Sequence, residues 1–195
     1  MADATATVDI AALHAAIKAN LAAQFPQILD VDYYVDERDE LTAEQLPALF
    51  FEISEIQASP NHDPGSDQLA IMVRFEARLI WSFSQSLQAR LNVRVLAANI
   101  AAWMHSVTRW PDPQNNDSAL PGQAGKIQII GVYPDDFNPS LDKYHVQRIE
   151  WQQLFWLGES VWADLTSGTA PSKVFASFAP DIGPANAGEY VQVNE

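Results

Sequence analysis

The sequence predicts an α/β fold of the α+β type: one small domain whose antiparallel or mixed four-stranded sheet is packed by two helices, followed by an extended C-terminal arm. Three observations predict it. Two segments repeat apolar residues at helical spacing, and four others have the length or two-residue alternation of strands. From about Ala163 onward the composition shifts to Ala, Ser, Pro and Gly, so residues 1–162 are expected to form the domain and residues 163–195 the arm.

The first helix is predicted over residues 9–25, where Asp9 is a suitable N-cap and Pro26 ends the helical pattern. Its apolar residues recur at steps of three and four, and its expected core face comprises Ile10, Leu13, Ile17 and Leu21. Residues 36–41, DERDEL, read as a charged loop and turn.

Four strands are predicted. The most regular alternation runs from Leu69 to Trp81, where the odd positions are apolar and the even positions include Arg74, Glu76 and Arg78, so one face is expected to be buried. Turn residues fill the segment SPNHDPGSD that precedes this strand. The other strands are expected at residues 48–56, 126–133 and 145–158.

The second helix is predicted over residues 85–108, between a cap at Ser84 or Ser86 and the Trp110-Pro111 pair. Its core face is expected to be one apolar stripe widened by neighbouring residues. The stripe comprises Leu87, Leu91, Val95, Ala98 and Ala102, and the widening residues are Val93, Leu96, Ile100 and Trp103. Residues 111–125 are predicted to be a long loop.

Composition excludes several functions. The chain has no cysteine, which excludes disulfides, thiolate metal sites and thiol nucleophiles. Its formal net charge of −14 repels nucleic acid phosphate, so it serves solubility or lets DNA pass without sticking. No segment is apolar enough for a membrane span, and the N-terminus does not resemble a secretory signal, so we expect assembly and use in the cytoplasm or within a larger particle.

No catalytic, cofactor-binding or metal-binding residues are expected. The four histidines fall in different elements, without the spacing of a metal pair. A hydrolase would need several scattered groups to converge in one pocket. The candidates for such a pocket are Asp135, Asp136, Asp142, His145 and Glu150.

The tryptophans divide into two groups. Those inside predicted elements are expected in the core, namely Trp81, Trp103, Trp151 and Trp156. Trp110 and Trp162 stand near element ends and are expected to be less constrained.

The C-terminal arm carries apolar anchors on a backbone that its prolines and glycines bar from regular helix or central strand. The anchors are Phe175, Phe178, Ile182, Tyr190 and Val191. Such a segment docks on another copy or another protein, or it folds back onto its own domain. Docking on a neighbouring subunit is the prediction.

The sequence resembles a known family over most of its length. The order of helices and strand pairs, the segments GKIQIIGVYPDDF and HVQRIEWQQLFWLGESVW, and the closing phrase FAPDIGPANAGEYVQV are similar to tail terminator (tail completion) proteins of long-tailed bacteriophages. The similarity is greatest to those of Mu-like and related siphophages, and it runs over roughly residues 9–193. The loop at 111–125 and the reach of the arm exceed the family's usual pattern.

The resemblance implies a structural, non-enzymatic virion protein. Its members form a ring, commonly a hexamer, at the head-proximal end of the tail tube, where the ring stops tube polymerisation and docks the head completion proteins of the neck. The implied partners are other copies, the tail tube protein and a head completion or neck protein, with DNA passing through the lumen without specific binding. The alternative is another neck, head–tail joining or baseplate component of a phage or contractile injection system.

One charged loop is the candidate acidic lumen or rim of such a ring. Its residues are Asp36, Glu37, Asp39 and Glu40. A plain solvated turn is the alternative interpretation of the same residues.

Overall fold

The computed structural model describes residues 7–33, 41–82, 87–135 and 144–161, and the backbone of residues 175–176 and 191–192. It divides into two compact units, Met1–Val161 and Trp162–Glu195, each of which is considered by itself. None of the described helices is long and apolar enough to cross a lipid bilayer.

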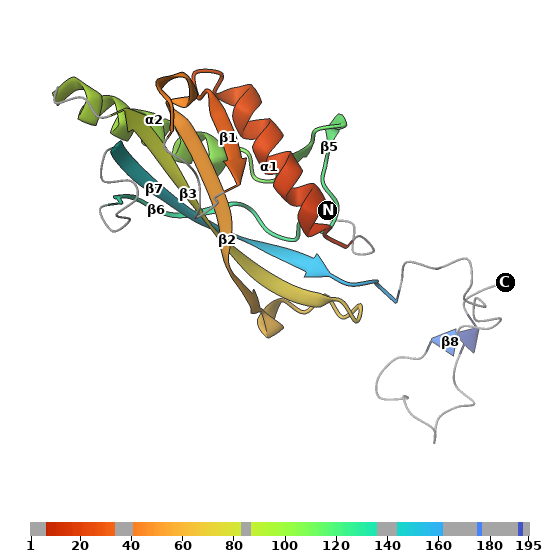
Figure 1. The fold of residues 1–195 in the computed structure, drawn as a ribbon. Coiled ribbons are helices and arrows are strands. Elements are labelled where there is room, and N and C mark those ends of the chain that lie inside the picture. The colour runs from red at the N-terminus through yellow and green to blue at the C-terminus, as the bar shows by residue number, and fades with distance from the viewer. Residues whose placement is uncertain are drawn as a thin grey trace. The chain divides into compact units, whose positions relative to one another are not determined.

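A mixed five-stranded sheet forms the centre of the first unit (Figure 1). Strand β1 runs parallel to β2, and every other neighbouring pair is antiparallel. The predicted α+β class is confirmed, in its mixed form. The strands, in spatial order, are β1 (Asp30–Tyr33), β2 (Ala48–Ala58), β3 (Leu69–Ser82), β7 (Tyr144–Leu157) and β6 (Gln128–Pro134).

Strand β1 adds a fifth strand to the four that the sequence predicts. Its four residues are too short a stretch to show alternation, and its pairing with β2 is what defines it. Short 3-10 turns, η1 (Ala43–Gln45) and η2 (Pro60–His62), precede β2 and β3 respectively.

Both helices, α1 (Ile10–Gln24) and α2 (Leu87–Ser106), contribute to one core against the same face of the sheet. Asp9 caps α1 as predicted, because its carboxylate accepts hydrogen bonds from the backbone N–H groups of Ala11 and Ala12. The predicted alternation of β3 is confirmed. Its buried, core-facing residues are Ile71, Val73, Phe75, Ala77 and Leu79.

Aromatic rings fill the middle of this core. Phe75 of β3 stacks on its cross-strand partner Trp151 of β7, with ring centroids 5.1 Å apart. A smaller apolar cluster lies on the opposite face of the sheet. It comprises Ala48, Phe50, Ile80 and Val146, with Leu41, Leu46 and Tyr144 against it.

The predicted core stripe of α2 is wrong. Leu91 and Val95 are 55% and 49% exposed, and Ala98 and Ala102 are exposed as well. The helix has apolar residues on most of its circumference, so periodicity offers two faces and only the position of the sheet selects one. The buried residues are Ala89, Val93, Leu96, Ala97, Ile100, Ala101 and Met104, of which Val93, Leu96 and Ile100 had been expected to widen the stripe.

Trp110 was expected to be less constrained, and it is fully buried instead. The segment after it, predicted as a loop, contains a small hairpin of β4 (Pro111–Asp112) and β5 (Asn115–Ala119). The side-chain amide of Gln123 holds this segment in place through two hydrogen bonds. It accepts one from the Trp110 backbone N–H at 2.7 Å and donates one to the Trp110 carbonyl at 2.8 Å. A side-chain amide thus replaces the strand partner that a backbone segment would otherwise need.

Glycine is required at the crossing of this segment with the N-terminal residues. Gly122 has a φ of +73°, and a Cβ at this position would lie 2.2 Å from the backbone nitrogen of Val8. The Val8 N–H donates to the Trp156 carbonyl at 2.8 Å, and the Trp156 N–H donates to the Gly122 carbonyl at 2.9 Å. Residues 7–8 are therefore held between the loop and the end of β7.

Candidate functional site

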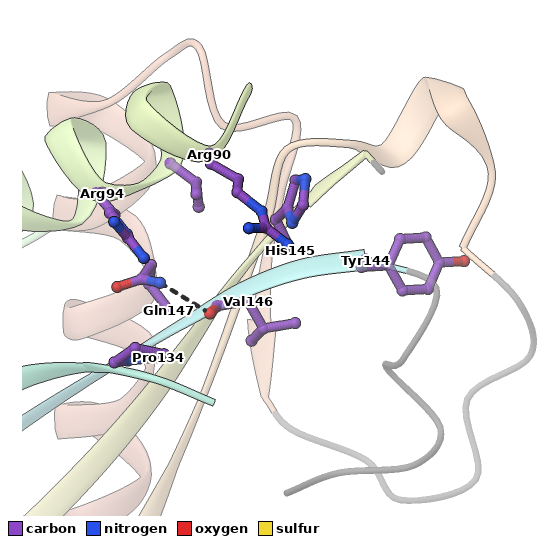
Figure 2. A pocket seen from close by; sticks show the side chains of 8 residues that line it. Arg90, Arg94, Pro134, Tyr144, His145, Val146 and Gln147 are labelled. Atoms are coloured by element: carbon purple, nitrogen blue, oxygen red, sulfur yellow. Dashed lines mark hydrogen bonds between the residues drawn. The ribbon is translucent and has the colours of Figure 1, made fainter. Parts of the chain in front are cut away.

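A pocket of about 200 Å³ lies between the first turns of α2 and the adjoining ends of β6 and β7 (Figure 2). Helical spacing of four places Arg90 and Arg94 on the same side of α2, and strand alternation places His145 and Gln147 on the same side of β7. Figure 2 shows the Arg90 side chain reaching towards His145 and the Arg94 side chain towards Gln147. The remaining lining residues are Val93, Pro134, Tyr144 and Val146.

This pocket is electropositive, although the chain carries a net charge of −14. Within the described part of the chain, Arg90 and Arg94 make no ion pair, whereas Arg74, Arg78 and Arg148 do. The first turn of α2 has no acidic residue, so the arginines add to the partial positive charge that a helix carries at its N-terminal end. Gln147 is only 7% exposed, and its amide donates to the Val146 carbonyl at 3.1 Å.

The donors that line the pocket suit an anion. Guanidinium groups bind carboxylate and phosphate through paired N–H donors, and no carboxylate is among the lining residues that the structure describes. The pocket is therefore a candidate oxyanion site rather than a cation site. Among the described residues no group of three or more His, Asp or Glu side chains could hold a metal ion.

The sheet face opposite the helices carries a network of ion pairs. Arg78 of β3 binds Glu52 of β2 at 2.6 Å and Asp135, just after β6, at 3.0 Å. Arg148 of β7 binds Glu150 at 3.0 Å. Residues of like charge lie opposite one another on neighbouring strands. Each of these carboxylates is therefore neutralised by arginines at the next positions on the same face of the sheet.

Glu150 also binds Arg74, and this hydrogen bond raises the pKa of Arg74. Glu150 and Asp135 are both 5% exposed at the side chain, so their charges depend on the arginines that surround them.

The structure separates the predicted candidates for a hydrolase. Asp135 and Glu150 join the ion-pair network on one face of the sheet. His145 lies in the pocket on the helical face. Asp136 and Asp142 lie outside the described residues.

The described histidines occupy different surroundings. His14 of α1 lies against the rings of Tyr33 and Phe51, with centroids 4.8 and 5.6 Å away, and burial lowers its pKa. The ring of His62 is hydrogen-bonded to the Ser59 hydroxyl at 2.9 Å, and His105 lies in the last turn of α2.

Strand β6 forms one edge of the sheet and, among the described strands, pairs only with β7. Its seven residues, Gln128–Pro134, carry no charge. A bulge displaces Ile130, which is 38% exposed, and Tyr133 is 40% exposed. Gly131 lets the Tyr133 ring lie over the strand, because a Cβ there would be 2.2 Å from the tyrosine hydroxyl. Since no described strand pairs with its outer side, this edge presents apolar side chains and backbone hydrogen-bonding groups within the described part of the chain.

Most of the predicted arm anchors and the whole candidate acidic rim lie outside the described residues. The anchors in this position are Phe178, Ile182 and Tyr190, and the rim residues are Asp36, Glu37, Asp39 and Glu40. Two anchors lie in short strands of the second unit, Phe175 in β8 (Phe175–Ala176) and Val191 in β9 (Val191–Gln192). These strands pair antiparallel, with Phe175 opposite Gln192 and Ala176 opposite Val191.

Sequence reasoning missed the pocket. Arg90 and Arg94 are recognisable as two arginines one turn apart, but the pocket exists only because β7 begins beside the start of α2. Comparison of the sequence with models of known protein families and with curated proteins gives no match.

Proposed function

We propose that the protein is a structural component of a phage virion, a tail terminator that assembles as a ring, commonly of six copies, at the head-proximal end of the tail tube. The ring ends tube polymerisation, docks the head completion or neck protein, and lets DNA pass through its lumen. The observation that carries the proposal is the exposed, uncharged edge of β6.

An edge strand of this kind favours assembly. Natural edge strands are blunted by charged side chains, prolines or bulges; β6 has a bulge at Ile130 and ends at Pro134, but it carries no charge and exposes Ile130 and Tyr133. An extended segment from another copy can add to such an edge through backbone hydrogen bonds. An edge of one copy that receives a segment of another copy makes a heterologous contact, which closes into a ring when the rotation permits.

The charge of the chain and its resemblance to tail terminators support the same function. A subunit with a net charge of −14 would surround DNA without adding the salt-dependent contacts that cationic side chains make to phosphate. The C-terminal unit supplies a segment for the neighbouring edge, since its sequence alternates apolar anchors with prolines and glycines.

The edge contact is tested with Ile130→Lys in the full chain. Wild-type protein should form rings by sedimentation velocity and negative-stain microscopy, and the charged edge should weaken assembly about 10-fold or more. Leu29→Lys is the matched control, because Leu29 is 59% exposed in the turn before β1, away from β6. Rings that form equally well in both variants would contradict the edge as the assembly surface.

The position in the virion is tested in the phage. Interrupting the gene should leave tails of irregular length that do not join heads, and an antibody label on the protein should mark the head-proximal end of the tail. Tails of normal length, or a label at the distal tip, would exclude a terminator and favour another neck or baseplate component.

A further inference from the structure

We propose that the pocket between α2 and β7 binds carboxylate side chains of the C-terminal arm of a second copy. This inference rests on the proposed ring and names a second contact, beside the β6 edge, that would stabilise it. The receiving residues are Arg90 and Arg94, with His145 and Gln147 on the opposite wall.

The size of the pocket limits its occupant. Sites for cofactors and drug-sized ligands usually measure about 300–1,000 Å³, and this pocket measures about 200 Å³. Such a volume admits the head groups of acidic side chains or a small oxyanion. The two guanidinium groups one turn apart can each form paired hydrogen bonds with a carboxylate.

The surroundings of the pocket favour a protein segment over DNA or free phosphate. Each pocket arginine is followed by an exposed apolar residue, Leu91 after Arg90 and Val95 after Arg94. Pro134 belongs both to the pocket lining and to the uncharged edge of β6. A ligand that covers this surface must bring apolar groups as well as negative charge, and the net charge of the chain opposes a polyanion.

The C-terminal arm has the complementary sequence. Its acidic residues are Asp164, Asp181, Glu189 and Glu195, against Lys173 as its one basic residue. Asp181 directly precedes the anchor Ile182, and Glu189 directly precedes the anchor Tyr190. The arm thus repeats an acidic–apolar pair, as α2 repeats a basic–apolar pair.

A double-mutant cycle in the full chain tests the contact. The pocket variant is Arg90→Gln/Arg94→Gln, and the arm variant is Asp181→Asn/Glu189→Gln. Charge-assisted hydrogen bonds of this kind correspond to about a 10- to 100-fold change in dissociation constant. Each variant should weaken assembly by that factor in sedimentation, and the combined variant should be no weaker than the poorer of the two.

Arg109→Gln is the control for the single variant Arg94→Gln, because each removes one positive charge and Arg109 lies beyond the far end of α2, outside the pocket. Fully additive effects of pocket and arm variants, or equal effects of Arg94→Gln and its control, would overturn the inference. Arg94→Lys, which keeps the charge but loses the paired donors, should give an intermediate loss.

A mixing experiment separates a contact between copies from one within a copy. A pocket variant keeps its arm and an arm variant keeps its pocket, so a mixture contains one intact combination and should recover association that neither variant shows alone. No recovery would indicate a contact within one copy and would overturn the inference.

The outcomes distinguish this inference from the proposed function. Rings that form in wild type and persist unchanged in the pocket variant would overturn the pocket contact and leave the ring intact. Wild-type protein that stays monomeric would contradict both. Binding of a DNA fragment by wild type that the pocket variant loses would assign the pocket to nucleic acid instead.

Discussion

Replacing Gln123 by methionine tests how the segment after α2 is held to the sheet. The Gln123 amide bonds both backbone groups of Trp110, donates to the Leu120 carbonyl at 3.1 Å, and accepts from the Gln153 amide at 3.0 Å. Gln123 is 2% exposed and Trp110 is fully buried. Methionine keeps the length of the side chain while removing every one of these hydrogen bonds.

The expected loss of stability depends on which buried groups are left without any hydrogen-bond partner. The Trp110 carbonyl still accepts from the Leu120 N–H, and the Gln153 amide still donates to the Gly125 carbonyl. The Trp110 N–H has no second acceptor among the described residues and becomes a buried unpaired donor. One unpaired buried donor and the weakened partners together should lower the free energy of unfolding by about 2–4 kcal/mol.

Urea denaturation followed by tryptophan fluorescence and circular dichroism measures this loss. Gln152→Met is the matched control. Gln152 is adjacent on β7 to Gln153, the partner of Gln123, and its own hydrogen bond to Gln128 is exposed. The control should change the free energy of unfolding by less than about 0.5 kcal/mol. A Gln123→Met loss below about 1 kcal/mol, or no larger than the control, would refute the role assigned to the amide.

Three further predictions concern stability. Gly122→Ala should lower the free energy of unfolding by more than about 2 kcal/mol beyond the effect of Gly65→Ala. Both glycines have positive φ, but only at Gly122 would the added Cβ clash with backbone atoms; equal losses by urea denaturation would contradict this. Arg78→Gln should lower the free energy of unfolding by about 1–3 kcal/mol, because it removes ion pairs of a guanidinium that is 14% exposed. Lys18→Gln breaks a more exposed pair and should lower it by less than about 1 kcal/mol; a reversed order would be inconsistent with the network. Burial lowers the pKa of His14 below 6.5, so the unfolded state takes up the proton first and the free energy of unfolding falls as the pH drops below that value. His14→Gln should make the free energy of unfolding less dependent on pH in this range, and an unchanged pH profile would exclude this cause.

The sequence by itself determined the elements whose periodicity is one-sided. In β3 apolar and charged residues alternate without exception from Val73 to Leu79, so strand type and buried face both follow from the pattern. Helix α1 was likewise predictable, because Asp9 and Pro26 mark its ends in the sequence.

Only the tertiary structure decided which face of α2 is buried, that Trp110 belongs to the core, and where the pocket lies. A helix that is apolar on most sides gives no preferred face until a sheet is placed against it. The Trp110 ring packs against Trp103 and Trp151, and its backbone exchanges hydrogen bonds with Gln123, thirteen positions away, which no local pattern encodes. Arg90 and His145 come from distant segments, and only the packing of α2 on β7 makes them line one pocket.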